Sequence, residues 1–457
     1  MKTALEAMIK QGRIGLLLTA VWASGCAWPF GAKKGPEGPD EWRARMQPSL
    51  TGEEAGRIAQ GISLHEAIVL AVRRNPGVEA ARRQWLAAIH REPQAITPDD
   101  PMLSELSYDF QMDIWSSVQP EMSVPWIQKL WARGKIAAEE SDIARLQWEA
   151  AVRDLIIEVK DSYYELYYLD QASAITEKIE QMFRNDAVLA YQELNNGRAE
   201  LGEAFRAESQ AAQLSYDRLL LAEQRAAQAE RLKSLLNLPP ETPIGPARAA
   251  PVYPISERVE PLYKRAEQYA EVLKIRGLEI QRARHETFLA RLSRAPDVTV
   301  GTAVSSLAGG LPTDFFKGDR SYMGMISFNL PIYEWRNRAL VKEKKATEEM
   351  LWRAALEETN QVRQAVAKAY FEARSTGRLA RLYAETLLPQ AQAVVRQAEI
   401  DFRSDQSSFS NVIETTLAYH NFLLAYHRAL ADYGQAIGRL EQTLGSTAES
   451  RSGGGEE

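Results

Sequence analysis

The segment from Lys129 to Glu193 contains no proline and reads as one uninterrupted helix of about 65 residues. Apolar side chains recur along it at Ile156, Val159 and Tyr163, which is the spacing of a helix-packing seam. At roughly 1.5 Å per residue such a helix is ~97 Å long. No compact domain of this size needs a helix of that length, so the segment predicts an elongated helical architecture.

The chain contains two similar halves, which indicates an internal duplication. Three matched pairs lie at offsets of 206 to 208 residues: Pro125 with Pro331, Tyr163 with Tyr370, and Gly197 with Asp405. Each half is predicted to contain an opening helix (63–91 and 259–292), a strand pair, a very long helix, a tight turn and a returning helix. Ser63 and Glu66 have the spacing of a capping box. The second long helix begins near Arg336 and is expected to kink at Pro389.

The strand pairs are predicted at about 104–125 and 296–331. Alternation runs from Leu106 through Ile114 and favours one strand there, while "SYMGMISFNLPIYEW" (321–335) favours another, with Met323 and Met325 on its inner face. We expect the following aromatic and aliphatic residues to face lipid: Tyr108, Phe110, Tyr322, Ile326 and Phe328. The alternative is a pair of soluble hairpins lying on the helices, although an isolated hairpin is barely stable in water. The sequence has no apolar stretch of ~18 residues, which excludes a transmembrane helix but leaves transmembrane strands open.

The N-terminus reads as a secretory signal peptide, with basic residues followed by an apolar run from Ile14 to Ala23. Cys26 is the only cysteine, so no intrachain disulfide can form. "ASGC" (23–26) resembles the bacterial lipobox, which implies that Cys26 carries lipid, including palmitate. Because Ala27 is not aspartate, the resemblance implies an outer-membrane anchor. The alternative is an ordinary signal peptide with a chance cysteine.

The sequence carries no catalytic, nucleotide-binding or metal-binding motif, so an enzyme and a cofactor are not expected. A net charge of −6 without a basic stripe argues against nucleic-acid binding. His420 and His427 lie two helical turns apart, too far to chelate one ion, and are expected to be ordinary histidines of a helix surface. Met323 and Met325 are expected to line a lumen, with passing contact to Cu(I) as the less favoured reading.

Four strands cannot close a barrel by themselves. Residues 61–445 resemble the outer-membrane efflux protein (TolC) family, and the resemblance is most specific at two turns. The second turn has Phe402, Asp405 and Asn411 in "FRSDQSSFSNVIE"; the first has Gly197 and Glu203, with the aromatic residue displaced to Tyr191. The resemblance implies a mostly α fold with a small β part. Duplicated long-helix hairpins would form an α-helical barrel, and four transmembrane β-strands per chain would complete a trimeric β-barrel.

The resemblance implies a passive exit duct of a tripartite efflux system in the outer membrane, extending into the periplasm. Its partners would be two further copies of the chain, outer-membrane lipid, a periplasmic adaptor (membrane fusion) protein and an inner-membrane pump of the resistance-nodulation-division type. The adaptor would dock on the turns, at Asn196, Gly197, Arg198, Asp405, Gln406 and Ser407. The alternatives are the outer-membrane component of a type I protein secretion system and a non-pore periplasmic spacer lipoprotein.

A second resemblance concerns the substrate. "DDPMLSELSY" (99–108) and "VPWIQKLWARGKIA" (124–137) look like segments of the heavy-metal (CzcC/CusC-like) branch, although Ile127 and Gln128 depart from its pattern. The predicted organisation is a signal peptide (1–25), a lipid-anchored tether (26–60), a first repeat (61–237), an inter-repeat linker (238–256), a second repeat (257–445) and a disordered tail (446–457).

Overall fold

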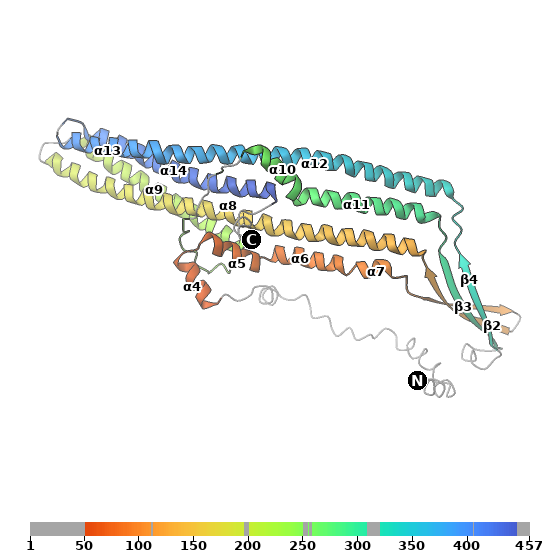
Figure 1. The fold of residues 1–457 in the computed structure, drawn as a ribbon. Coiled ribbons are helices and arrows are strands. Elements are labelled where there is room, and N and C mark those ends of the chain that lie inside the picture. The colour runs from red at the N-terminus through yellow and green to blue at the C-terminus, as the bar shows by residue number, and fades with distance from the viewer. Residues whose placement is uncertain are drawn as a thin grey trace, which may run out of the picture. The chain divides into compact units, whose positions relative to one another are not determined.

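The computed structural model describes residues 51–110, 113–195, 201–249, 255, 258–308, 320–404 and 406–445 (Figure 1). The chain divides into two compact units. The strand unit contains the described residues of Arg91–Ala137 and His285–Lys345, and the helix unit contains those of Met46–His90, Ala138–Arg284 and Ala346–Glu457. Among the helices in these described ranges, none combines the length and the apolar character needed to cross a membrane. Cys26 and the signal peptide lie outside the described residues.

The strand unit contains one four-stranded antiparallel sheet in the order β1-β2-β3-β4. Its strands are β1 (Met102–Phe110), β2 (Asp113–Val124), β3 (Val298–Ala308) and β4 (Arg320–Phe328). The two predicted strand pairs therefore join into one sheet through β2 and β3. The expected single strand from Leu106 to Ile114 is wrong, because β1 ends at Phe110 and Phe110 pairs with Asp113 across a hairpin.

The long helices follow the duplicated order that the sequence predicted. In the first half α8 (Ile127–Asn195, 69 residues) is followed by the returning helix α9 (Leu201–Leu235). In the second half α12 (Glu334–Leu382) passes through a π-helical turn, η3 (Tyr383–Leu387), into α13 (Leu388–Arg403), and α14 (Phe409–Leu444) returns.

The π-helical turn explains how the second long helix accommodates Pro389. Proline lacks an N–H group and its ring clashes with the carbonyl group four residues earlier. The turn η3 lies directly before α13, which has the proline in its first turn. The π-helical hydrogen bonds, which span five residues instead of four, therefore occur where proline removes an α-helical hydrogen bond. The expected break at Pro389 is confirmed as a local change of helical pitch.

The opening helices are broken where continuous helices were expected. In the first half α5 (Leu64–Arg74) ends before α6 (Pro76–Ile89), and the short α7 (Glu92–Ile96) follows. The Asn75 side chain caps α6 by accepting from the N–H groups of Gly77 and Val78, and Pro76 occupies the first turn, which suits a helix start. In the second half α10 (Val259–Tyr269) and α11 (Glu271–Arg291) are separated by Ala270, and a 3-10 turn, η1 (Leu292–Arg294), follows.

Part of the expected tether is helical and packed. Helix α4 (Gly52–Gln60) begins with a capping box between Thr51 and Glu54, and its Ile58 is buried. The predicted capping box of Ser63 and Glu66 starts α5 and is confirmed. Residues 52–60 of the expected tether are therefore not an unstructured connection, because Thr51 and Glu54 satisfy the first N–H groups of a helix that the short apolar pattern did not indicate.

A buried tyrosine fastens the linker between the halves to the helix unit. Tyr163 of α8 is fully buried, and its hydroxyl group lies 3.0 Å from the carbonyl oxygen of Ile62 and 2.6 Å from that of Arg248. Ile62 also forms an isolated parallel bridge with Ala247. Leu166, Leu232 and other buried residues of α5, α8 and α9 enclose this point in one apolar cluster.

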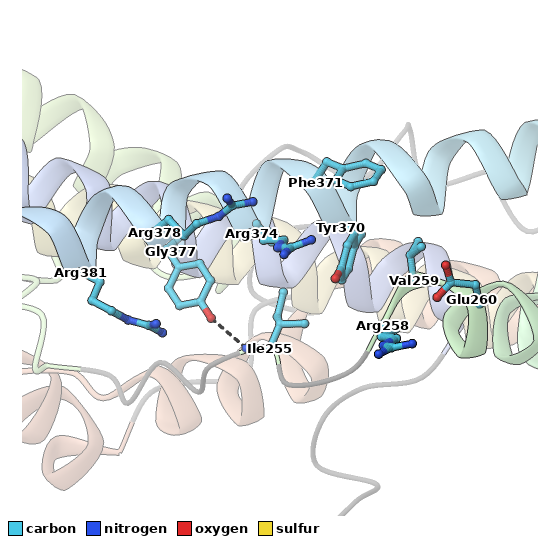
Figure 2. A pocket seen from close by; sticks show the side chains of 12 residues that line it. Ile255, Arg258, Val259, Glu260, Tyr370, Phe371, Arg374, Gly377, Arg378 and Arg381 are labelled. Atoms are coloured by element: carbon cyan, nitrogen blue, oxygen red, sulfur yellow. Dashed lines mark hydrogen bonds between the residues drawn. The ribbon is translucent and has the colours of Figure 1, made fainter.

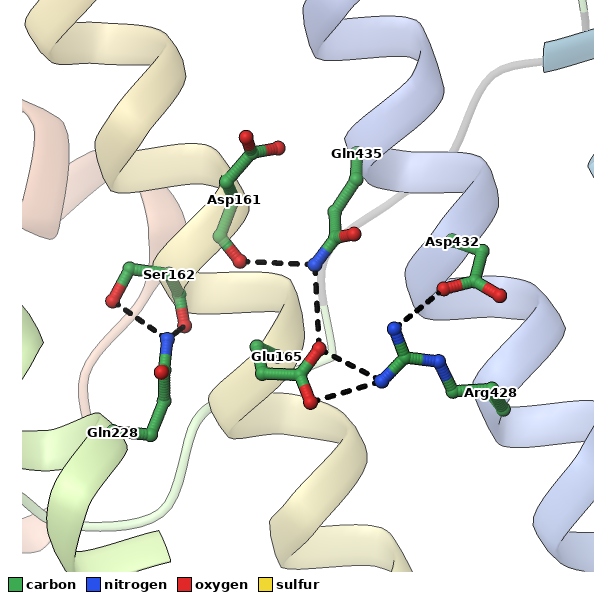
Figure 3. A network of polar contacts seen from close by, with 7 residues as sticks. All are labelled: Asp161, Ser162, Glu165, Gln228, Arg428, Asp432 and Gln435. Carbon is green, nitrogen blue, oxygen red and sulfur yellow. Dashed lines mark hydrogen bonds and ion pairs between the residues drawn. The ribbon is translucent and has the colours of Figure 1, made fainter. Parts of the chain in front are cut away.

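A polar network joins α8 to α9 and α14 inside the helix unit (Figure 3). Arg428 donates to both carboxylate oxygens of Glu165, at 2.9 and 2.8 Å, and forms an ion pair with Asp432 at 2.8 Å. Gln435 donates to the carbonyl oxygen of Asp161, and Gln228 donates to the carbonyl and hydroxyl oxygens of Ser162. Burial raises the pKa of the Asp161 carboxyl group. Side-chain donors thus fix α9 and α14 against one stretch of α8.

The expectation of surface histidines is wrong for His420. This residue of α14 is buried, and its Nε2 lies 3.3 Å from the Thr176 hydroxyl group of α8. His427 is half-buried and lies beside the ring of Tyr167. Burial lowers the pKa of both imidazoles, because the charged form loses hydration. Both histidines therefore belong to the helix packing.

We predict that Tyr163→Phe destabilises the protein by roughly 1–3 kcal/mol, because the Arg248 carbonyl oxygen, 2.6 Å from the hydroxyl group, loses its donor, whereas the Ile62 carbonyl oxygen still accepts from the Arg248 N–H at 3.1 Å. The matched control is Tyr164→Phe, at the next position of α8. Tyr164 is buried and has no hydrogen bond among the described residues, so its hydroxyl group should be nearly dispensable. Thermal unfolding of the purified protein checks both variants. Equal melting temperatures for the two variants would contradict the role given to the Tyr163 hydroxyl group.

Candidate channel-forming site

Over residues 117–124 of β2, 298–304 of β3 and 322–328 of β4 the two faces of the sheet differ in polarity, whereas the register places both apolar and polar positions of β1 among the residues of each side. Strand pairing fixes which residues share a face, because side chains alternate along a strand and directly paired residues lie on one side. One face, here called the apolar face, carries Val118, Met122, Val124, Val298, Val300, Val304, Tyr322, Ile326 and Phe328. The opposite face, here called the polar face, carries Ser117, Gln119, Glu121, Ser123, Thr299, Met323, Met325 and Ser327.

The apolar face is exposed in the chain. The exposed fractions of Tyr322, Ile326 and Phe328 are 73%, 65% and 57%. Tyr322, Ile326 and Phe328 thus share one side of β4, with Met323 and Met325 on the other, and contact of the first side with lipid stays a prediction. No helix or strand among the described residues covers these exposed aliphatic and aromatic side chains. They form a surface that suits an apolar environment.

The five residues expected to face lipid do not share one face. Pairing places positions Tyr108 and Phe110 on the polar face, with Ser117, because Phe110 pairs with Asp113 across the hairpin. The side chains at 108 and 110 lie outside the described part of the chain. The expectation that all five point the same way is therefore corrected. The apolar residues of the first half that share the side of Ile326 are Val118, Met122 and Val124 of β2.

The polar face carries hydrogen bonds and a close contact. The Gln119 amide group donates to the Ser117 hydroxyl group at 2.9 Å. A Cβ atom at Gly301 would lie 3.1 Å from Glu121 Cγ and 3.5 Å from Met325 Cε. A glycine at this position therefore leaves room above β3 for the Glu121 and Met325 side chains of the two neighbouring strands.

Large aromatic and aliphatic side chains surround the ends of β2 and β4, just before α8 and α12 begin. Trp126 is 45% exposed and Trp335 is 74% exposed. Leu330, Ile332 and Tyr333 are also exposed. Tryptophan and tyrosine at the ends of apolar strands are typical of side chains that lie at a membrane–water boundary.

A buried ion pair holds the two halves together at this boundary. Lys129 Nζ of α8 lies 2.8 Å from Asp297 Oδ1 and donates to the carbonyl oxygen of Ala295, also at 2.8 Å. Asp297 also accepts from the Trp126 N–H at 3.2 Å, and its own N–H donates to the Asn329 side chain at 2.6 Å. The Lys129 side chain is only 9% exposed. Contacts of one carboxylate and one ammonium group thus align the start of α8 with β3 and the end of β4.

The turn between α13 and α14 is a compact helical reversal. The Gln406 N–H donates to the Asp401 carbonyl oxygen at 2.8 Å, and Asn411 donates to the Ser407 hydroxyl group at 3.0 Å. The rings of Phe402 and Phe409 lie 5.3 Å apart across the turn. Gln406 and Ser407 are thus placed in the reversal, whereas Asp405 and the whole first-turn set, Asn196, Gly197 and Arg198, lie outside the described residues.

The two helical reversals share one apolar cluster. Phe183 of α8, Ala207 of α9, Ala398 of α13 and Phe409 of α14 are buried in it together. Arg206 of α9 also donates to the Ser410 hydroxyl group of α14. In the helix unit the parts of α8, α9, α13 and α14 that lead toward the two turns therefore pack together.

The described residues contain no group of three or more His, Cys, Asp or Glu side chains arranged to hold a metal ion. The junction built on Lys129 was not predicted from the sequence. Its partners lie up to 168 residues away, and a single buried lysine near a strand end has no periodic pattern. The only local signal was the "RAPD" stretch (294–297) before a predicted strand.

The fold is similar to those of solved outer-membrane proteins. CusC, studied for folding and transmembrane channel formation, matches with a TM-score of 0.74 and 12% identity over 88% of this chain and 96% of that chain. VceC, an outer membrane protein of Vibrio cholerae, matches with a TM-score of 0.71 and 16% identity over 84% and 96%. The CmeC outer membrane channel of Campylobacter jejuni matches with a TM-score of 0.71 and 12% identity over 89% and 91%.

No family model and no curated protein matches the sequence. The chain has the fold of these outer-membrane channels, and the mostly helical fold class with a small four-stranded sheet is confirmed. The resemblance seen in the sequence is confirmed at the level of the fold. CusC stands among several channels of similar score, so the heavy-metal branch stays a prediction.

We predict that Asp297→Asn lowers stability by about 1–3 kcal/mol, because Lys129 keeps its burial but loses its charged partner. Asparagine retains an oxygen for the Trp126 N–H, so the variant isolates the charge. The control is Arg294→Gln, which removes an exposed pair with Glu334 at 3.6 Å and should cost less than about 1 kcal/mol. Heat-induced unfolding in detergent measures both. A control variant as unstable as Asp297→Asn would argue against a special role for the buried pair.

Proposed function

We propose that this protein is the trimeric outer-membrane channel of a tripartite efflux system, a passive exit duct without enzymatic chemistry. Small molecules or metal ions would reach it from an inner-membrane pump of the resistance-nodulation-division type through a periplasmic adaptor. The chain would stand in the outer membrane and extend into the periplasm. One observation carries the proposal: over β2, β3 and β4 the sheet has an exposed apolar face and an opposite polar face, and among the described residues its edges at β1 and β4 are unpaired.

The sheet supports a membrane location because of its two-sided polarity. Transmembrane strands alternate between lipid-facing apolar residues and lumen-facing polar residues. Ile326 and Val300 would contact lipid, and Glu121 and Ser117 would line the water-filled interior. The exposed Trp126 and Trp335 would mark the boundary between the membrane and the periplasm.

The unpaired edges support assembly of several chains. Among the described residues β1 and β4 each pair on one side only. An open strand edge is not viable in lipid, where backbone groups have no water to bind. The β4 edge of one chain would pair with the β1 edge of the next. The sheet alone calls for at least two chains, and the resemblance to the efflux family selects three.

The lipid anchor and the partners rest on the sequence. We propose that Cys26 carries acyl chains that add an anchor in the outer membrane; labelled palmitate that still enters a Cys26→Ser variant would refute this. The adaptor would bind the helical turns at Asn196–Arg198 and Asp405–Ser407. The joint apolar cluster below these turns supports that proposal, because it holds the four helices that lead into them.

We predict opposite outcomes for arginine on the two faces of β4. Ile326→Arg should cost roughly 2–4 kcal/mol if the position lies near the middle of the membrane, and should reduce insertion into the outer membrane. Met323→Arg, three residues away on the polar face and similarly exposed at 62%, should insert and conduct ions in planar bilayers. The fraction of heat-modifiable trimer in outer membranes and the single-channel conductance are the two readouts.

Equal tolerance of both arginines would mean that the sheet does not contact lipid. A monomeric wild-type protein in the soluble periplasmic fraction would favour the spacer without a pore. If the particle in detergent has the mass of one chain and still conducts ions, the proposed trimer would be rejected but the channel function would stand.

We predict that replacing Gly197 with phenylalanine leaves the trimer and its insertion intact but abolishes efflux and adaptor cross-linking. A glycine backbone permits close approach by another chain, and a bulky side chain blocks it. Asp405→Gly should be mild, because that change removes bulk rather than adding it. Normal export by the Gly197 variant would show that the turn only reverses the chain.

A further inference from the structure

A pocket rich in arginine lies in the helix unit, between α12 and the start of α10 (Figure 2). Its volume is about 690 Å³. Arg374, Arg378 and Arg381 line it from α12, and Arg258 lines it from the residue before α10. Among the described residues that line the pocket, Glu260 is the one acidic side chain. These residues bring four positive charges and one negative charge to the pocket.

These arginines differ from others on the same helix. Arg338, Arg353 and Arg363 of α12 each form an ion pair with a glutamate. In the part of the chain that the structure describes, Arg374, Arg378, Arg381 and Arg258 form no ion pair or hydrogen bond. Three like charges three and four residues apart repel one another on a helix. The sequence thus tolerates a repulsion that a bound anion would relieve.

The corresponding place in the first half is closed by a carboxylate. The alignment of Tyr163 with Tyr370 puts Asp170 at the position of Gly377. Asp170 Oδ1 accepts from Arg225 Nε at 2.5 Å, and Oδ2 accepts from the Ala247 N–H at 2.7 Å. There the carboxylate pairs with an arginine of α9 and holds the linker at Ala247.

The second half has replaced that ion pair by a floor for the pocket. Tyr433 of α14 stands where Arg225 stands in α9, if the starts of the two returning helices are matched. A Cβ atom at Gly377 would lie only 2.8 Å from Tyr433 Cε2, so the ring packs directly on the glycine. The Tyr433 hydroxyl group accepts from the Ile255 N–H at 3.2 Å, which fixes the ring (Figure 2). The second half therefore has no carboxylate at this position, and the pocket beside Gly377 is lined by arginines.

We propose that this pocket binds a small polyanion that carries at least two carboxylate or phosphate groups. The guanidinium group matches both anions through two parallel N–H bonds. The backbone positions of Arg374 and Arg381 are separated by about 10 Å along the helix, which favours an anion with more than one charged group over a single carboxylate or phosphate. The volume lies in the usual range for small-molecule sites, roughly 300–1,000 Å³. The proposal does not depend on the transport function.

Isothermal titration calorimetry of the purified full chain in detergent tests the site. Inorganic pyrophosphate and citrate are the probes, and sodium chloride at matched ionic strength is the blank. At least one probe should bind at one site per chain, and the tighter one identifies phosphate or carboxylate as the preferred group. Arg378→Gln combined with Arg381→Gln should weaken binding at least tenfold, and Arg258→Gln, from another element, should weaken it as well.

The matched control is Arg353→Gln, on the same helix but paired with Glu349 and outside the pocket. It should bind the probes as the wild type does. Heats no larger than those of sodium chloride, or equal weakening by Arg353→Gln, would overturn the site in favour of general charge attraction. A particle mass that falls when Arg378 and Arg381 are replaced would also overturn it, because the arginines would then contact a second copy of the chain.

Discussion

The unpaired backbone groups of β1 and β4 are the constraint on which the rest of this architecture depends. A sheet of four strands leaves one row of N–H and C=O groups open at each edge, and such rows pair with another strand or stay in water. The exposed apolar face of Ile326 and Val300 argues against water on that side. If the sheet lies in lipid, only other copies can satisfy its edges. The buried pair of Lys129 and Asp297 fixes the start of α8 against β3 and the end of β4, and so sets the position of these strands relative to the helix.

The sequence predicted that these segments form strands, but it did not predict which residues of different strands lie on the same face of the sheet. Alternation from Leu106 to Ile114 continues without a break through the hairpin, so the pattern gives no sign of where the chain reverses. The pairing of Phe110 with Asp113 places those two positions on one side and moves Ile114 to the other. The alternation of side chains identifies the two faces only within one strand. If the turn is misplaced by one residue, every side chain of the next strand is assigned to the wrong face. For this reason Tyr322, Ile326 and Phe328 were assigned to one face correctly, whereas Tyr108 and Phe110 were joined to them wrongly.

The helices were predicted where a strong local signal existed. A long proline-free seam predicted α8, Pro389 predicted the change at η3, and Ser63 with Glu66 predicted the start of α5. The breaks at Asn75 and Ala270 were missed, because apolar periodicity continues across each of them. Contacts between distant residues were missed as well. The spacing of residues along the sequence does not show that Lys129 is buried against Asp297, because only tertiary packing brings the two groups together.

The duplication shows how one sequence pattern acquires two uses. Tyr163 and Tyr370 occupy matched positions, yet the first clamps the linker through two carbonyl groups and the second lines the arginine pocket. The change can be traced to one neighbouring position. Asp170 keeps Arg225 and the Ala247 N–H in place, so the first half closes on itself. Gly377 has no side chain to offer, and Tyr433 fills the gap with an aromatic ring instead of a charge. At the same offset Arg374, Arg378 and Arg381 face Tyr167, Gln171 and Ala174, so the second half carries three charges where the first half has none. Within the described residues these arginines have no acidic partner, which is the arrangement of a site that takes its anion from outside the chain.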